Sequence, residues 1–146
     1  MLIGNHPAKV DEKGRLKIPA EFRSYLEQTF GPEVFVTSVE GESALIYPLK
    51  VWEAIRDKLK QVPAMDPSRQ RYDQRTNYFG QVSAMDKQGR ILIHSTLRDS
   101  AATAGEVAVL GKDNHLEVWN RERFLRKLES QPFSVEDMNR LASYGI

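Results

Sequence analysis

Apolar and polar residues alternate along two short segments near the start of the chain, residues 7–10 and 15–18. Alternation with a period of two is typical of a β-strand that buries one face. Asp11-Glu12-Lys13-Gly14 joins the segments, and Asp at the first position of a turn with Gly at the fourth favours type I geometry. The pattern therefore predicts a β-hairpin whose buried face carries Ala8, Val10, Leu16 and Ile18.

The same kind of pattern predicts the elements that follow. Pro19 fits the first position of a helix, whose buried stripe is Phe22, Tyr25, Leu26 and Thr29. Further strands are expected at 34–39, 44–47, 80–85, 90–93, 106–111 and 115–119, with the 80–85 and 90–93 strands forming a second hairpin. Further helices are expected at 49–62, 69–79, near Ser95, at 121–129 and after the capping-box sequence that begins at Ser134.

The chain repeats itself once. Asp11, Gly14 and Arg15 correspond to Asp86, Gly89 and Arg90, each at an offset of 75 residues. A weaker match follows, at an offset of 72, between Leu45-Ile46-Tyr47-Pro48 with Trp52 and Glu117-Val118-Trp119-Asn120 with Phe124. Two copies indicate an internal pseudo-dimer. We therefore divide the chain into a first repeat, a linker with a helix, a second repeat and a helical tail, at 1–62, 63–79, 80–130 and 131–146.

The outer face of the first predicted hairpin collects positive charge. Strand alternation places Lys9, Arg15 and Lys17 on that face, with Lys13 at the tip. Four cations exceed what a stable turn requires, and the major groove of DNA admits a two-stranded ribbon. The turn also has a purely structural interpretation, in which Asp11 caps the backbone and pairs with Arg15 across the hairpin.

The second hairpin carries less charge by the same test. Its buried side chains are expected to be Val82, Ala84, Ile91 and Ile93. Arg90 would lie outside with Gln81, Ser83 and Leu92, and Lys87 at the tip. We therefore expect the first hairpin to dominate phosphate binding.

Composition limits the alternatives. The 146 residues are 40% hydrophobic with a formal net charge of +1, which fits a folded domain. The net charge neither favours nor excludes DNA binding, so a basic DNA-binding surface depends on where the charged residues lie. The absence of cysteine excludes disulfides and thiolate chemistry. No apolar run approaches a membrane span and no signal peptide is evident, so we expect a soluble, cytoplasmic protein. Its three histidines, His6, His94 and His115, lack metal-ligand spacing, and no nucleophile–base pair indicates an enzyme; we expect no metal or cofactor.

Two aromatic positions are interpreted as structural. Trp52 and Phe124 stand at helical spacing beside other apolar residues, among them Leu125 and Leu128. Such side chains belong more often to a core than to a ligand platform.

On these residues the sequence resembles the MraZ family of bacterial transcription regulators, within the AbrB-like swapped-hairpin superfamily. The resemblance rests on Asp11–Pro19, Ala44–Pro48 leading to Trp52, Asp86–Ile93 and Val118-Trp119. It implies an α+β fold: a tandem-repeat, swapped-hairpin β-barrel with flanking helices and an internal pseudo-two-fold axis. The chain departs from full symmetry where His94 replaces the equivalent of Pro19 and where Lys17 has no counterpart in the second repeat.

The resemblance also implies a function. Members of the family form ring-shaped homo-oligomers and bind short direct repeats in the promoter of the division and cell-wall gene cluster. Arg15 and Arg90 would be the principal DNA-facing side chains, and Asp11 and Asp86 would fix the turns. We thus expect a nucleoid-associated regulator that binds double-stranded DNA. The alternative is a protein-interaction module of the same fold, antitoxin-like or an assembly scaffold.

Overall fold

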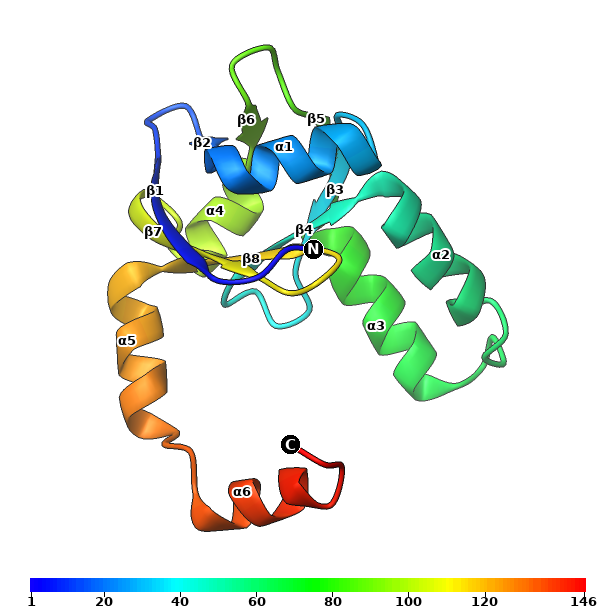
Figure 1. The fold of residues 1–146 in the computed structure, drawn as a ribbon. Helices are drawn as coiled ribbons and strands as arrows, with labels where there is room; N and C mark the ends of the chain where they lie inside the picture. The colour runs from blue at the N-terminus through cyan, green and yellow to red at the C-terminus, as the bar shows by residue number, and fades with distance from the viewer.

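The structure is a computed structural model that describes residues 1–146, with eight strands and six helices (Figure 1). The strands are β1 (Asn5–Val10), β2 (Arg15–Lys17), β3 (Glu33–Thr37), β4 (Ala44–Pro48), β5 (Gln81–Ala84), β6 (Arg90–Leu92), β7 (Gly105–Gly111) and β8 (Leu116–Asn120). The helices are α1 (Ala20–Thr29), α2 (Leu49–Leu59), α3 (Pro67–Tyr78), α4 (Ser95–Ala101), α5 (Arg121–Ser130) and α6 (Val135–Ala142).

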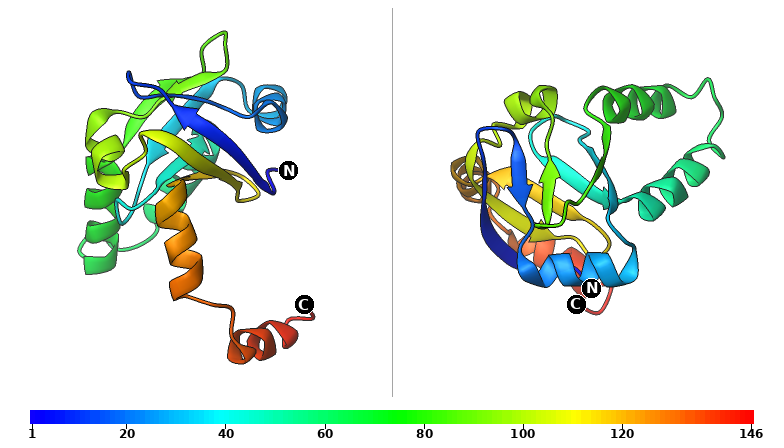
Figure 2. Two further views of the ribbon diagram at one scale, coloured as in Figure 1. Left: turned by 90° about the vertical axis from the view of Figure 1, so that its left-hand side faces the viewer. Right: turned by 90° about the horizontal axis from the view of Figure 1, so that it is seen from above.

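All eight strands belong to one antiparallel sheet, in the order β5-β3-β4-β8-β7-β1-β2-β6. The sheet curls into a nearly closed barrel, and its two edge strands, β5 and β6, approach each other (Figures 1 and 2). Curling buries residues on the inner face of every strand except β5, whose residues are exposed or partly buried. The core holds 19 buried residues and includes Leu16, Val36, Ile91 and Val109, which come from both halves of the chain.

The two repeats exchange strands. β1 of the first repeat pairs with β7 of the second, and β5 of the second pairs with β3 of the first. The equivalent strands β2 and β6 pair with each other, as do β4 and β8. The barrel is therefore interleaved about an internal pseudo-two-fold axis, which confirms the expected α+β swapped-hairpin fold. The division at 62, 79 and 130 stays a prediction.

The prediction of a second hairpin was wrong in one respect. β5 and β6 share the turn bond from Asp86 N to Arg90 O, but they do not form a ladder: β5 pairs with β3, β6 pairs with β2, and both are edge strands. Val82 lies opposite Phe35 in that ladder, and Phe35 stacks on Trp52 outside the barrel. Val82 and Ala84 are therefore exposed, and Ser83 is partly buried instead.

The first hairpin and most helices follow their predictions. β1 pairs with β2 through Val10 and Leu16, both buried. Helix α1 begins at Ala20, one residue after the expected start, and Thr29 at its end is exposed instead of buried. Trp52 is buried, which confirms its assignment to a core: it packs against the aromatic rings of β3, β4 and α3.

Helix α5 departs from expectation. Phe124 is only half-buried, against Trp119, while Leu125 and Leu128 have 49% and 54% of their surface exposed. The reason is visible in Figure 1, where α5 leaves the barrel and α6 continues away from it. The capping box predicted at Ser134 does begin α6. No helix has the length and apolar character to cross a membrane.

Candidate nucleic-acid interface

The Asp11–Arg15 turn is fixed by the Asp11 carboxylate. Its Oδ1 accepts hydrogen bonds from the backbone N–H groups of Lys13 (3.0 Å) and Arg15 (2.9 Å), and its Oδ2 accepts one from Arg15 Nε (2.9 Å). Gly14 has a φ of +83°, a conformation that glycine adopts without strain. Both the backbone and the guanidinium of Arg15 are thus held by one side chain.

The Asp86–Arg90 turn repeats this arrangement. Asp86 Oδ1 accepts from the N–H groups of Gln88 and Arg90, both at 2.9 Å, and Oδ2 accepts from Arg90 Nε at 2.8 Å. Gly89 has a φ of +75°. The two turns therefore have the same internal geometry.

These hydrogen bonds change the acidity of both carboxyls. The backbone N–H of Arg15 is the main influence that holds the pKa of Asp11 below its ordinary 3.8, and the N–H of Arg90 acts in the same way on the pKa of Asp86. Both residues are therefore charged at neutral pH, and both ion pairs are in place.

Strand pairing joins the two turns into one surface. In the β2–β6 ladder Arg15 lies opposite Leu92, and Lys17 lies opposite Arg90. Paired residues project to the same side of a sheet, as do residues two apart in a strand. Arg15, Lys17, Arg90 and Leu92 therefore share one outer surface, which we call the β2–β6 face.

The guanidinium groups on this face are accessible. The side chains of Arg15 and Arg90 are 34% and 29% exposed, and their hydrogen bonds use Nε, which leaves Nη1 and Nη2 of both free. Both turns project from the same end of the molecule (Figure 1). Each arginine is therefore held in place through Nε, with two further guanidinium nitrogens that make no hydrogen bond within the protein.

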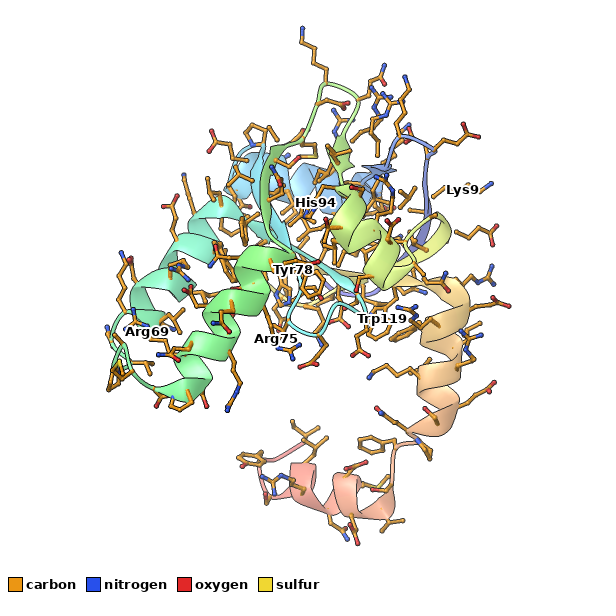
Figure 3. All side chains as sticks on the ribbon, turned by 180° about the vertical axis from the view of Figure 1, so that it is seen from behind. Lys9, Arg69, Arg75, Tyr78, His94 and Trp119 are labelled. Atoms are coloured by element: carbon orange, nitrogen blue, oxygen red, sulfur yellow. The ribbon has the colours of Figure 1, made fainter.

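The predicted lysines surround this face. Lys13 and Lys87 are exposed on the two turns. Lys9 points outward from β1 (Figure 3) and shares a surface hollow with Lys17. The structure thus brings the six predicted cations to one end and one adjoining side of the barrel.

Two further arginines, which the sequence analysis missed, support the turns. Arg98 of α4 donates to the carbonyl of Ile93 (2.8 Å), and its guanidinium fills the space beside Gly14. Arg23 of α1 donates to the carbonyl of Lys87 (2.9 Å) and lies against Gly89.

The supporting arginines are equivalent in the two repeats, because 23 + 75 = 98, the offset of the turns themselves. Each supports the turn of the other repeat, so strand exchange also exchanges these contacts. Extending the repeat alignment a few residues into the helices would have found the pair.

Other candidate residues lie elsewhere. His94 Nε2 is 2.8 Å from the carbonyl oxygen of Phe79, and no three His, Cys, Asp or Glu side chains come together as metal ligands would. Arg69 and Arg75 of α3 lie away from the turns (Figure 3) and donate to the backbone carbonyls of Val62 and Val39. These hydrogen bonds connect α3 to the segment that follows α2 and to the segment that follows β3.

The fold and the site together define a class: a swapped-hairpin barrel of two interleaved repeats that presents paired Asp-x-x-Gly-Arg turns. Sequence comparison gives the family. The family model described as "MraZ protein, putative antitoxin-like" matches residues 1–75 and 81–142, and the chain belongs to this family.

Curated relatives carry one name. The proteins called Transcriptional regulator MraZ from Acidobacterium capsulatum and Koribacter versatilis are 45% and 44% identical, with full coverage of both chains in each comparison. The protein of the same name from Tolumonas auensis is 31% identical over 140 residues, which cover 95% of this chain and 92% of that one.

Proposed function

We propose that this protein is a sequence-specific DNA-binding transcriptional regulator that contacts DNA through the β2–β6 face. The observation that carries the proposal is the β2–β6 register, which places Arg15 and Arg90 on one surface. The printed name of its relatives, transcriptional regulator, supports the same function.

The chemistry of the face suits a DNA duplex. A guanidinium with two free nitrogens forms a bidentate pair with guanine O6 and N7 in the major groove, or binds a phosphate. The Asp11 and Asp86 carboxylates fix the orientation of these groups before DNA arrives, so less side-chain entropy is lost on binding. Lys9, Lys13, Lys17 and Lys87 supply the phosphate contacts that position the protein.

The proposed assembly explains how a chain of net charge +1 binds a polyanion. A ring of identical subunits presents several β2–β6 faces along the duplex, and short direct repeats supply a matching series of sites. Linked contacts then multiply weak individual affinities. The promoter of the division and cell-wall gene cluster is the proposed target, which places the protein at the nucleoid.

Footprinting on the DNA upstream of the protein's own gene tests the proposal. We expect regularly spaced protected segments with the wild-type protein and weak or no protection with Arg15→Ala. The matched control is Arg71→Ala, which removes an exposed arginine of α3 and should leave the footprint unchanged. Equal protection by both variants would overturn the assigned face.

Salt dependence separates this function from the protein-interaction alternative. Phosphate contacts release counterions, so the binding constant must fall steeply as salt rises. Binding to the upstream DNA that does not respond to salt, or no binding at all, would favour an antitoxin-like or scaffold role.

A further inference from the structure

One apolar side chain lies among the cations of the β2–β6 face. Leu92 is 45% exposed and belongs to neither of the two hydrophobic clusters of the molecule. It lies opposite Arg15 in the β2–β6 ladder and two residues along β6 from Arg90. In the right-hand view of Figure 2, α1 and α4 lie at opposite ends of the β2–β6 pair, and neither helix covers it. Leu92 is therefore an exposed apolar group on the surface that the proposed function places against DNA.

The internal pseudo-two-fold axis shows why this residue is unusual. Leu16 and Ile91 lie opposite each other in the ladder and are equivalent at the 75-residue offset of the repeats, so the axis passes between them. The axis relates the outer side chains in two pairs: Arg15 with Arg90, and Lys17 with Leu92. The face is therefore symmetric in its arginines, and it differs only in having a lysine at one end and a leucine at the other.

Protection of the sheet edge does not account for this difference. β6 is an edge strand, whereas β2 lies inside the sheet between β1 and β6. Proteins protect exposed edge strands with charged side chains, especially lysine. Here the lysine is on the interior strand and the leucine is on the edge strand, which is the reverse of what protection against edge-to-edge pairing favours. A ligand that takes an apolar contact gives the leucine a role.

Thymine offers such a contact in the major groove. Its 5-methyl group is recognised there by apolar side chains, and guanine is recognised in the same groove by arginine. Cross-strand neighbours have Cβ atoms about 4.5–5.5 Å apart, and successive base pairs are about 3.4 Å apart. Leu92 therefore reaches the base pair that Arg15 contacts or the next one. At the other end of the face Lys17 lies opposite Arg90, where its ammonium group binds phosphate.

We propose that Leu92 contacts the 5-methyl group of a thymine in the major groove and sets the orientation of the β2–β6 face on DNA. The two arginines alone would allow the face to bind in either direction, because the pseudo-two-fold axis exchanges them. A leucine at one end and a lysine at the other make the two directions unequal. The inference deepens the proposed function and rests on it, since it requires that this face bind DNA.

Removal of the thymine methyl groups tests the contact. The probe is a duplex of one protected segment from the DNA upstream of the protein's own gene, made either with thymine or with uracil, which lacks the methyl group. The wild-type protein should bind the uracil duplex about fourfold more weakly for each methyl group contacted, as expected for the burial of one such group. Leu92→Ser should bind both duplexes with the same, weakened affinity. Met65→Ser, at an exposed residue between α2 and α3, is the matched control and should behave like the wild type. Equal binding of both duplexes by the wild type, or an undiminished preference for thymine in Leu92→Ser, would overturn the contact.

Exchange of the two unequal side chains tests the orientation. An iron chelate that cuts DNA, attached at Glu12→Cys, marks the end of each protected segment at which the first turn lies. We expect Lys17→Leu with Leu92→Lys to move the cuts to the opposite end, and both positions are exposed, so the exchange leaves the core intact. Cuts at the same end in both proteins would overturn the orienting role. Absence of any protected segment with the wild-type protein would instead contradict the proposed DNA function, so the two failures are distinguishable.

Discussion

The two Asp-x-x-Gly-Arg turns have the same internal geometry and different surroundings. Their corresponding hydrogen bonds agree to within 0.1 Å. Lys9 and Lys13 accompany the first turn and Lys87 the second, whereas Lys17 of the first repeat lies opposite Arg90 in the β2–β6 ladder. A short sequence therefore fixes a turn and the direction of its arginine, while the charge around that arginine depends on the flanking strands.

Substitution of Gly14 and Gly89, the glycines of the two turns, extends this comparison. These substitutions are expected to have the largest effect of those considered, a loss in the free energy of unfolding. A Cβ at Gly14 would lie 1.7 Å from Arg98 Nη1 and 2.8 Å from the Ile93 carbonyl oxygen, whereas one at Gly89 would meet only the flexible side chain of Arg23, at 2.7 Å. Positive φ adds strain of about 1–2 kcal/mol at both positions.

We expect Gly14→Ala to lower the free energy of unfolding by about 2–5 kcal/mol, because overpacking adds about 1–3 kcal/mol to the strain. For Gly89→Ala we expect only the strain, about 1–2 kcal/mol. Urea denaturation measures both. Equal losses would show that the support from Arg98 is no tighter than that from Arg23.

The next largest effect is expected at the arginines themselves. Arg15 and Arg90 are held alike and exposed alike, so Arg15→Ala and Arg90→Ala should each weaken DNA binding by about 1–3 kcal/mol per contact. Fluorescence anisotropy on the footprinted DNA measures the losses, with Arg71→Ala as control. A loss confined to Arg15→Ala would mean that only the first repeat contacts DNA.

Lowering the pH should protonate Asp11 and Asp86 and so remove the ion pairs of both turns. Because the folded-state pKa of Asp11 and Asp86 lies below 3.8, the stabilisation from their ion pairs is complete above pH 3.8 and is lost as pH falls through the lowered values. Carboxyl NMR titration should place both midpoints below 3.8. Asp11→Asn should remove the acid response of the Lys13 amide and leave that of Gln88 intact. A midpoint at or above 3.8 for either residue would contradict the hydrogen-bonded geometry.

The smallest effect is expected from the lysines at the two tips. Lys13→Ala and Lys87→Ala should each weaken binding uniformly across DNA sequences and reduce the slope of log K against log salt by about 1. A change in sequence preference with either variant would show that the lysine contacts a base.

Local features could be predicted from sequence, and partnerships between distant segments could not. Alternation and turn chemistry located β1, β2 and both turns, because these depend on neighbouring residues. The same alternation misplaced Val82, since the exposed face of β5 is set by its pairing with β3. Leu125 and Leu128 were misassigned because helical spacing shows that a face is apolar and does not show what covers it.

The same distinction between local features and long-range pairing applies to the residues of the candidate site. Arg15 and Arg90 were found through their motif, but their meeting on one face follows from the β2–β6 ladder, which joins residues 73 to 77 positions apart along the chain. Arg23 and Arg98 were missed because each acts on the turn of the other repeat.

Cleavage of DNA from the tips of the two turns tests the β2–β6 face most directly. The chain has no cysteine, so Glu12→Cys, Gln88→Cys and Met65→Cys each offer one attachment point for an iron chelate that cuts nearby DNA. We expect cuts within the protected segments from positions 12 and 88 and none from position 65. Cuts from position 65, with none from either tip, would show that DNA binds a different surface of the barrel.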